Sequence, residues 1–157
     1  MIADGTASTA FIDFDNTPGP VLDVPAFYDD RQFTQEFQLL FEGDRIQGVA
    51  GLYYLDARAN GAFDTVVGLL NTTTLTSGTV KTKSYAAFAD VSFDITEQLK
   101  LSGGLRYTKD DKTGTVFRRN YTGIRSPLFG NATAIPGLIR TDYTNDRSFE
   151  KLTPRVS

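Results

Sequence analysis

The stretch SYAAFADVSFDITEQLKLSGGLRYT, residues 84–108, decides the fold of this chain. On both sides of the short connection at residues 96–98, odd-numbered positions are mostly apolar and even-numbered positions are mostly small, polar or charged. The apolar set is Tyr85, Ala87, Ala89, Val91, Phe93, Ile95, Leu99, Leu101, Leu105 and Tyr107. Alternation with a period of two residues is typical of a β-strand with two different faces. The stretch therefore predicts an antiparallel hairpin with one apolar and one polar side.

Charged side chains keep to the even-numbered face of this hairpin, as Asp90 and Arg106 show. An apolar outside that meets lipid and a polar inside that meets a lumen is the arrangement of transmembrane β-barrels. A soluble β-sandwich is the alternative, because its strands alternate in the same way. The chain has no run of roughly 18 to 20 apolar residues, the length that a transmembrane helix requires.

Composition is compatible with both alternatives and excludes several functions. The chain has 157 residues, of which 40% are hydrophobic and 22% charged, as in an ordinary domain or in barrel strands that are half polar. Its net charge of −3 argues against a nucleic-acid partner, which would require a basic face. Cys and His are absent, which removes disulfides, thiolate metal sites and the commonest general base. We therefore expect no catalytic site, no cofactor and no metal site.

The intervals between strands alternate between short and long. We interpret the chain as an irregular loop over 1–32, a hairpin over 33–56, a loop over 57–80, a hairpin over 81–108, a loop over 109–148 and a strand over 149–157. Membrane barrels have short periplasmic turns and long extracellular loops, so the two later loops are predicted to be extracellular. The predicted strands are about nine to thirteen residues long, which suits a tilted crossing of the bilayer.

Aromatic residues fall at both ends of these predicted strands. The outer ends carry Tyr53, Tyr54, Tyr85 and Tyr107, and the inner ends carry Phe41 and Phe93. Aromatic side chains form the interface girdles of membrane barrels, so we expect these residues to lie at the two membrane surfaces. The second strand, from about Ile46 to Asp56, is apolar on both sides, and its pattern does not say which side faces out.

Five segments resemble, in order, strand motifs of TonB-dependent outer-membrane receptors. They are FTQEFQL (33–39), VAGLYYL (49–55), YAAFADVSFDIT (85–96), LSGGLRYTKD (101–110) and FEKLTPRVS (149–157). The pieces GLRY and LTPRV are the most specific of these. The resemblance extends over residues 33–157 with the loop spacing expected of the family.

The resemblance implies an all-β fold, an antiparallel up-and-down meander of about five strands from a barrel of about 22 strands with a plugged lumen. It implies a receptor in the outer membrane of a Gram-negative bacterium that takes up ferric siderophores or another scarce nutrient. The implied partners are outer-membrane lipid, the rest of the barrel, the plug domain, TonB and the nutrient. No plug or TonB box is recognisable, and an open sheet is not tolerated in lipid, so we expect that this chain does not transport alone.

Two groups of candidate functional residues follow from this resemblance. The polar-face charges expected to face the lumen and the plug are Glu36, Asp90, Lys100 and Arg106. The loop residues expected to meet an anionic iron chelate are Phe117, Arg118, Arg119, Tyr121 and Arg125. A solvated sheet face and an ordinary loop surface are the respective alternatives.

Other functions stay open at this level. A soluble sandwich would be a binding or adhesion module that is monomeric in buffer. An enzyme would require a carboxylate pair, for example Asp110 with Asp142. Paired carboxylates at 29–30 and 110–111 suit calcium chemically but lack a full ligand pattern.

Overall fold

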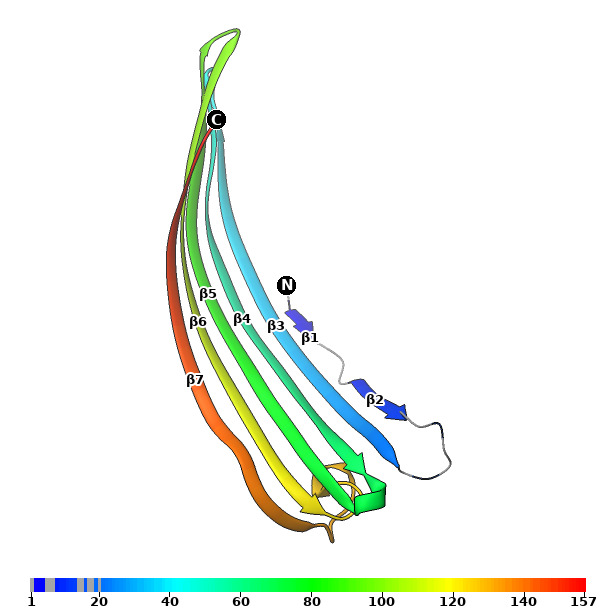
Figure 1. Ribbon diagram of the computed structural model, residues 1–157. Coiled ribbons are helices and arrows are strands. Elements are labelled where there is room, and N and C mark those ends of the chain that lie inside the picture. Colours follow the sequence, from blue (N-terminus) through cyan, green and yellow to red (C-terminus); the bar gives the residue numbers. More distant parts are fainter. Residues whose placement is uncertain (1, 5–7, 14–15, 17–18, 20) are drawn as a thin grey trace.

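All the described strands join a single antiparallel sheet (Figure 1). The computed structural model of the chain describes residues 2–4, 8–13, 16, 19 and 21–157. The long strands are β3 (Leu22–Glu42), β4 (Ile46–Val67), β5 (Thr72–Thr96), β6 (Leu99–Thr122) and β7 (Ile135–Val156). The short strands β1 (Ile2–Asp4) and β2 (Ser8–Asp13) both pair with β3. The predicted all-β fold is confirmed.

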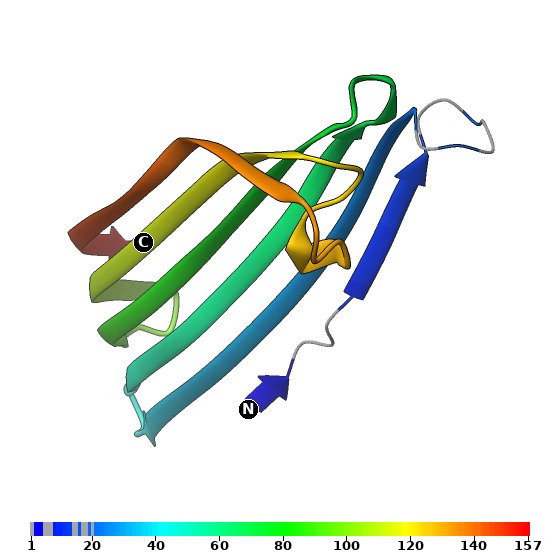
Figure 2. The same ribbon diagram turned by 90° about the horizontal axis from the view of Figure 1, so that it is seen from below.

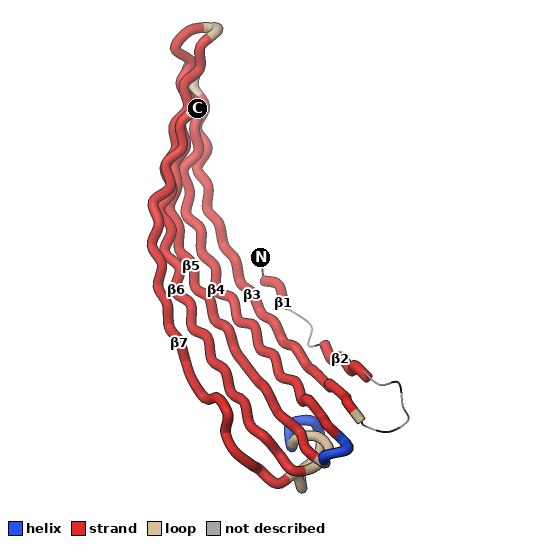
Figure 3. Tube along the Cα trace, in the orientation of Figure 1, coloured by secondary structure: helices blue, strands red, loops and turns tan. Residues whose placement is uncertain are grey.

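Each long strand pairs with the next one along the chain, which is the predicted up-and-down meander. The sheet is long and curved, and its connections lie at two opposite ends (Figures 1 and 3). We call one end the turn end, because residues 43–45 and 97–98 form short turns there. The other is the loop end, which holds the short 3-10 helices η1 (Gly68–Leu70) and η2 (Pro127–Phe129).

The pairing from β3 to β6 keeps one register over nearly the whole length, with a single shift between Asp94 and Thr96 at the turn end. Each strand therefore presents the same alternation to the same two sides. We call the side that carries Tyr85 and Ala87 the apolar face and the side that carries Ser84 and Ala86 the polar face.

Pairing also assigns β4, whose sequence is ambiguous. Tyr54 stands beside Tyr85 and Ala50 beside Ala89, so the even-numbered residues of β4 belong to the apolar face. Near the middle of β5, Ala86 is only 6% exposed, whereas Tyr85 is 46% exposed. This difference is expected where the polar face lies on the inside of the curve.

The long strands extend well beyond the predicted nine to thirteen residues, since β3 has 21 residues and β5 has 25. Residues 57–80 and 109–148, expected as loops, are strand except at 68–71 and 123–134. These loops were predicted from Thr and Gly over 57–80 and from Gly and Pro over 109–148, and the prediction was wrong in extent. Thr is β-branched and suits a strand, and the hydrogen-bonded ladder continues through residues 72–80 on both sides.

The expectation of an irregular segment over 1–32 is also wrong in part. Residues 22–32 belong to β3, and β1 and β2 lie along its free edge. Proline is tolerated in a strand where no ladder hydrogen bond is lost. Pro25 meets this condition, because it stands opposite Phe11 of β2 while the β3–β4 register skips Val24 and Pro25. Residues 1, 5–7, 14–15, 17–18 and 20 lie outside the description.

A second layer covers the sheet at the loop end. The segment 123–134, which includes η2, lies over β4 (Figure 2). Apolar side chains buried among the described residues are Ala26, Ala62, Val66, Leu75, Ala86 and Ala134. Ala62, Val66 and Leu75 belong to the apolar face by register, so this segment covers that face. No helix among the described residues is long and apolar enough to cross a membrane.

Candidate functional site

The residues predicted to face a lumen share the polar face. Glu36, Asp90, Lys100 and Arg106 all stand on that side by register. Lys100 Nζ lies 3.7 Å from Asp94 Oδ1, and Arg155 Nη1 lies 3.9 Å from Asp90 Oδ2. Exposed ion pairs of this kind contribute little to stability. They nevertheless give this face a charged surface made by β5, β6 and β7.

Arg106 is the centre of an aromatic cluster on the same face. Its guanidinium carbon lies 5.9 Å from the ring centre of Tyr53 and 5.8 Å from that of Phe88, within cation–π range. Its Nε donates a hydrogen bond to Thr108 Oγ1 at 3.2 Å. Tyr53, expected in the outer girdle together with Tyr54, therefore lies on the opposite side of the sheet. The reason is that neighbouring residues of a strand point to opposite faces.

The other residues predicted for the outer girdle, Tyr54, Tyr85 and Tyr107, form a row across the apolar face, whereas Phe41 and Phe93 stand on the same face near the turn end. The ring centres of Tyr54 and Tyr85 are 5.2 Å apart, and those of Phe33 and Tyr54 are 6.1 Å apart. Tyr107 stands beside Ala87 on this face. A shallow groove of about 480 Å³ lies here, lined by Gln35, Phe37, Leu52, Tyr53, Tyr54, Tyr85, Ala86, Ala87 and Tyr107.

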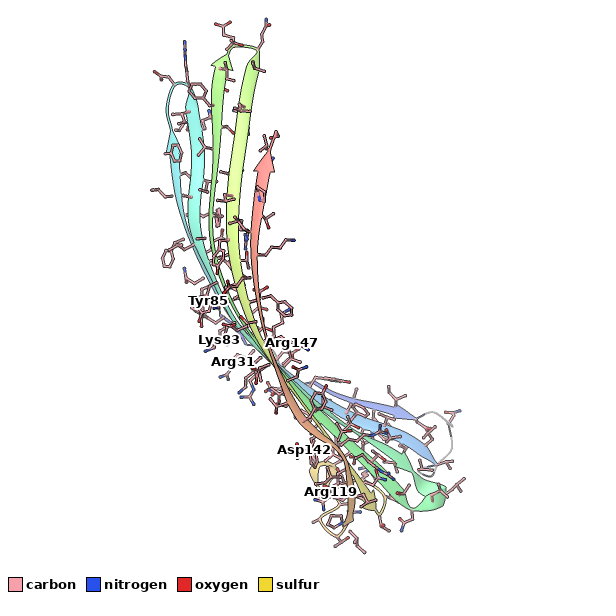
Figure 4. All side chains as sticks on the ribbon, turned by 60° about the vertical axis from the view of Figure 1, so that its left-hand side comes forward. Arg31, Lys83, Tyr85, Arg119, Asp142 and Arg147 are labelled. Carbon is pink, nitrogen blue, oxygen red and sulfur yellow. The ribbon has the colours of Figure 1, made fainter. Side chains whose placement is uncertain are left out.

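Charged side chains begin directly beyond the tyrosines on the same side. Lys83 lies 4.0 Å from Asp56, and Lys109 lies 3.1 Å from Glu150. In Figure 4, Tyr85, Lys83 and Arg31 lie on one side of the sheet and Arg147 on the other. The apolar face therefore changes from apolar to aromatic to charged in the direction of the loop end.

The segment 123–134, which we call the docked segment, is fastened to β4 and β5 by buried polar contacts. The Ser126 N–H donates to Asp64 Oδ2 at 2.6 Å, and the Arg125 N–H donates to Thr73 Oγ1 at 2.9 Å. Thr73 Oγ1 in turn donates to the Gly123 carbonyl at 2.8 Å. Gly123 has φ +128° and Arg125 has φ +80°, which lets the chain turn sharply back over the sheet.

Asp64 is the most perturbed of these groups. Its side chain is 0% exposed, and burial raises its pKa, partly offset by the hydrogen bond from the Ser126 N–H and the charge of Arg125. Asp64 Oδ1 and Ser126 Oγ are buried without a hydrogen-bond partner among the described residues. The Asp64 carboxyl therefore holds the docked segment on the sheet. The stability of this attachment depends on whether the carboxyl is protonated.

The residues predicted as loop ligand contacts do not form one site. Phe117, Arg118, Arg119 and Tyr121 lie on β6, and of the predicted set Arg125 alone lies in a loop. Arg118 stands on the polar face, whereas Arg119 and its neighbours Phe117 and Tyr121 stand on the apolar face. Arg119 lies 5.9 Å from the ring centre of Tyr121, and its Nε donates to the Gly137 carbonyl at 3.1 Å. Arg118 and Arg119 were grouped because they are adjacent in the sequence, but neighbouring residues of a strand point to opposite faces.

The carboxylates considered for other chemistry are also dispersed. Asp110 pairs with Phe149 and stands on the polar face, while Asp142 pairs with Phe117 on the apolar face. They cannot act together as an acid and a base across one substrate. No cluster of three or more potential ligands for a metal ion occurs among the described residues.

Comparison with known proteins gives a family and a fold. Residues 3–157 match the family described as TonB dependent receptor-like, beta-barrel. The crystal structure of the ferric yersiniabactin uptake receptor FyuA from Yersinia pestis is similar, with a TM-score of 0.64 and 17% identity. The match covers 88% of this chain and 20% of that receptor. At this identity the structural likeness concerns the fold alone. Among curated proteins no relative matches the chain.

Proposed function

This chain belongs to the TonB-dependent receptor β-barrel family, and on that premise we propose that it forms part of the wall of an outer-membrane receptor that imports a scarce nutrient. The observation that carries the proposal is the two-faced sheet, whose register keeps apolar and polar side chains on opposite sides. A two-sheet sandwich is not the fold of the described residues, which form one sheet. The soluble binding module therefore has no structural support.

The dimensions of the apolar band agree with a membrane crossing. On β5 the band runs from Ile95 to Tyr85, roughly 34 Å at about 3.4 Å per residue. At a tilt of about 40° this length gives a height of roughly 26 Å, close to the apolar band of known membrane barrels. We place the turn end in the periplasm and the loop end outside the cell, because short turns are periplasmic in such barrels.

The polar face is then the lumen side. Glu36, Asp90, Lys100 and Arg106 would face the lumen and the plug domain that the family implies. Arg118 shares this face with Arg106, so it is the best placed of the predicted ligand contacts to meet an anionic ferric chelate. FyuA, whose published description is a ferric yersiniabactin uptake receptor, is the reason to test iron chelates first.

The membrane orientation can be tested by cysteine scanning, because the chain has no natural cysteine. Single cysteines at Ala87, Ala89 and Val91 should react only with a lipid-soluble maleimide in the receptor that contains these strands, reconstituted in vesicles. Cysteines at Asp90, Ser92 and Lys100, on the polar face, should react with a charged, water-soluble reagent. Equal access of the water-soluble reagent to both sets would contradict the barrel-wall proposal.

Import can be tested in cells that express the receptor containing this chain. We expect uptake of at least one radiolabelled ferric siderophore, and we expect that uptake to be lost in a strain without TonB. Arg118→Ala should raise the concentration needed for half-maximal uptake, whereas Arg119→Ala, on the opposite face, serves as the matched control. Uptake that persists without TonB would refute the energy coupling, and equal effects of the two variants would refute the role of Arg118.

A further inference from the structure

We propose that the polar face of β6 and β7 is a path along which a multiply charged anionic ligand moves from the loop end toward the middle of the sheet. Five cations make this path, which we call the basic lane: Arg106, Lys112 and Arg118 on β6, and Arg147 and Lys151 on β7. The proposal rests on the proposed function and deepens it, because it gives the charge of the ligand and its route along the wall.

The cations of the basic lane are regularly spaced. On β6 they recur at every sixth position, 106, 112 and 118, and an even interval keeps them on one face. Arg147 stands directly opposite Lys112, and Lys151 stands opposite Thr108. Lys151 therefore lies between Lys112 and Arg106 along the lane. The lane is roughly 40 Å long, at about 3.4 Å per residue.

The positive charge of the basic lane is not neutralised by the chain itself. Nearer the turn end of the same face, Lys100 lies 3.7 Å from Asp94 and Arg155 lies 3.9 Å from Asp90. Among the described residues, no ion pair engages a cation of the basic lane, and all five cations are exposed. Asp110 is the one carboxylate on this face of β6 and β7. The lane therefore has a clear excess of positive charge.

The strongest attraction for an anion lies at Lys112 and Arg147. These two cations stand opposite each other in one register row, and like charges in this arrangement destabilise a sheet. A bound anion would remove the repulsion, and ammonium and guanidinium groups both bind carboxylate and phosphate oxygens well. In Figure 4, Arg147 lies on the opposite side of the sheet from Tyr85. The contacts of Arg106 are to two aromatic rings and a hydroxyl group, which leave its charge available.

The same face has the opposite charge on β3. Its charged residues there are all acidic: Asp30, Glu36 and Glu42. Residues 47–67 of β4 carry no charge on this face. One register row joins Gln32 of β3 to Lys112 of β6, so the division between the two sides runs along the strands. A face that is negative on one side and positive on the other directs an anion to β6 and β7.

A series of separate cations allows an anion to move, whereas one strong site would hold it. Passage requires binding that favours entry but permits release to the next site. Lys112, Lys151 and Arg106 follow one another at intervals of roughly 14 Å and 7 Å along the strands, comparable to the Debye length of about 8 Å. An anion that leaves one cation is therefore already attracted by the next. The lane begins near the loop end, where the ligand enters, which favours a moving ligand over a fixed protein partner.

The charge division is tested first, in the receptor that contains these strands, placed in lipid nanodiscs and without any other cysteine. Asn145→Cys introduces a thiol beside Arg147 on the polar face of β7, and Gln32→Cys introduces one on the same face of β3. The ratio of reaction rates with an anionic sulfonate and a cationic trimethylammonium methanethiosulfonate reports the local potential. This ratio should be roughly tenfold higher for N145C than for Q32C. Equal ratios would overturn the basic lane.

Uptake by cells that express the receptor and have TonB then tests the route. The probes are radiolabelled ferric citrate and ferric yersiniabactin. The variant K112Q/R147Q should lower the uptake of the imported probe roughly tenfold at low probe concentration. This difference from the parent should shrink when added salt screens the charges. A difference that is independent of salt would overturn the lane.

Two double variants are the controls for this measurement. K112R/R147K keeps both charges and should transport as the parent does. R58Q/K81Q removes two cations that pair with each other on the apolar face and should also leave uptake unchanged. A loss in either control as large as that in K112Q/R147Q would overturn the role of charge on the polar face.

Lys151→Gln distinguishes a path from a single binding site. Lys151 lies further from the loop end than Lys112 and Arg147, so the ligand meets it after capture. The variant should therefore slow uptake by a larger factor than it weakens binding of the probe to cells de-energised with an uncoupler. Unchanged uptake in Lys151→Gln would overturn the path.

Three outcomes separate this proposal from the proposed function and from a role in holding the plug. Absence of TonB-dependent uptake of both probes would overturn the import function and the lane with it. Parental uptake in K112Q/R147Q would overturn the lane alone. Leakage of a hydrophilic dye through the K112Q/R147Q receptor without any probe would show that these cations hold the plug, and it would also overturn the path.

Discussion

The turn-end half and the loop-end half of this sheet share one register but have opposite patterns of burial. Near the turn end, the apolar face is exposed, with Leu39 70% and Leu105 50% exposed. Near the loop end, the same face is covered by the docked segment, and Val66 is 1% exposed. One continuous β-ladder therefore joins a half whose apolar side chains are exposed to a half whose apolar side chains are buried in a small core. If the proposed function is correct, this difference marks where contact with the membrane ends.

The comparison is tested most strongly by placing a charge on the apolar face of the turn-end half. Ala89→Arg should destabilise the folded barrel in vesicles by roughly 2–4 kcal/mol, the cost of a cation near the bilayer midplane. Ser92→Arg is the matched control on the polar face and should cost less than about 1 kcal/mol. Urea titration in vesicles measures both, and equal losses would show that this half does not have a lipid side.

Glycines sharpen the same comparison in terms of packing. A Cβ on Gly51, in the turn-end half, would lie 2.5 Å from Phe88 Cζ and 2.7 Å from the Phe37 carbonyl, whereas one on Gly114, in the loop-end half, meets nothing within 4 Å. Gly51→Ala should therefore cost about 1–3 kcal/mol. Gly114→Ala should be neutral or stabilise by up to about 1 kcal/mol. The midpoints of the same urea titration measure both changes in stability. A larger loss in Gly114→Ala than in Gly51→Ala would contradict the packing described for β4 and β5.

The loop-end half should lose its own core when Asp64 is removed. Asp64→Ala leaves the buried Ser126 N–H without an acceptor, which costs about 1–3 kcal/mol, and the effect should stay within the docked segment. Hydrogen exchange of the amides in 123–134 is the measurement, with Thr65→Ala on the polar face as control. Loss of protection throughout β4 and β5 would show that the segment is not a separate layer.

The smallest expected effect is a pH dependence confined to this segment. Burial raises the pKa of Asp64 in the docked state, so the docked state binds the proton more tightly than the undocked state. Its stability is then fully present below the ordinary aspartate range and is lost as pH rises through the raised pKa. Protection factors of 123–134 should fall as the pH rises above the ordinary aspartate range, about pH 4. Asp64→Asn, which has no charge to titrate, should remove this dependence, and an unchanged slope in that variant would assign it to another group.

Prediction from the sequence was most successful where the signal is local. The hairpin over 81–108, the turns near 43–45 and 97–98, and the shared face of Glu36, Asp90, Lys100 and Arg106 follow from alternation alone. Tyr53 shows the limit, because its position near a strand end suggested a girdle while its parity places it beside Arg106. Arg118 and Arg119 show the same limit, since a cluster in sequence is divided between two faces. The docked segment could have been suspected only from Pro127 and Gly130, which mark a break without indicating what it packs against.

Consecutive residues were enough to predict the two-faced hairpins and the family, because alternation between neighbours and short motifs are local properties of the sequence. The tertiary structure alone decided how far the strands extend, which side of β4 faces out, and that Asp64, Thr73 and Ser126 meet. These features depend on partners distant in the chain, since β-pairing and loop docking are set by register and by burial against other strands. Arg31, Arg58 and Lys81, which lie far apart in the sequence on β3, β4 and β5, become neighbours for the same reason.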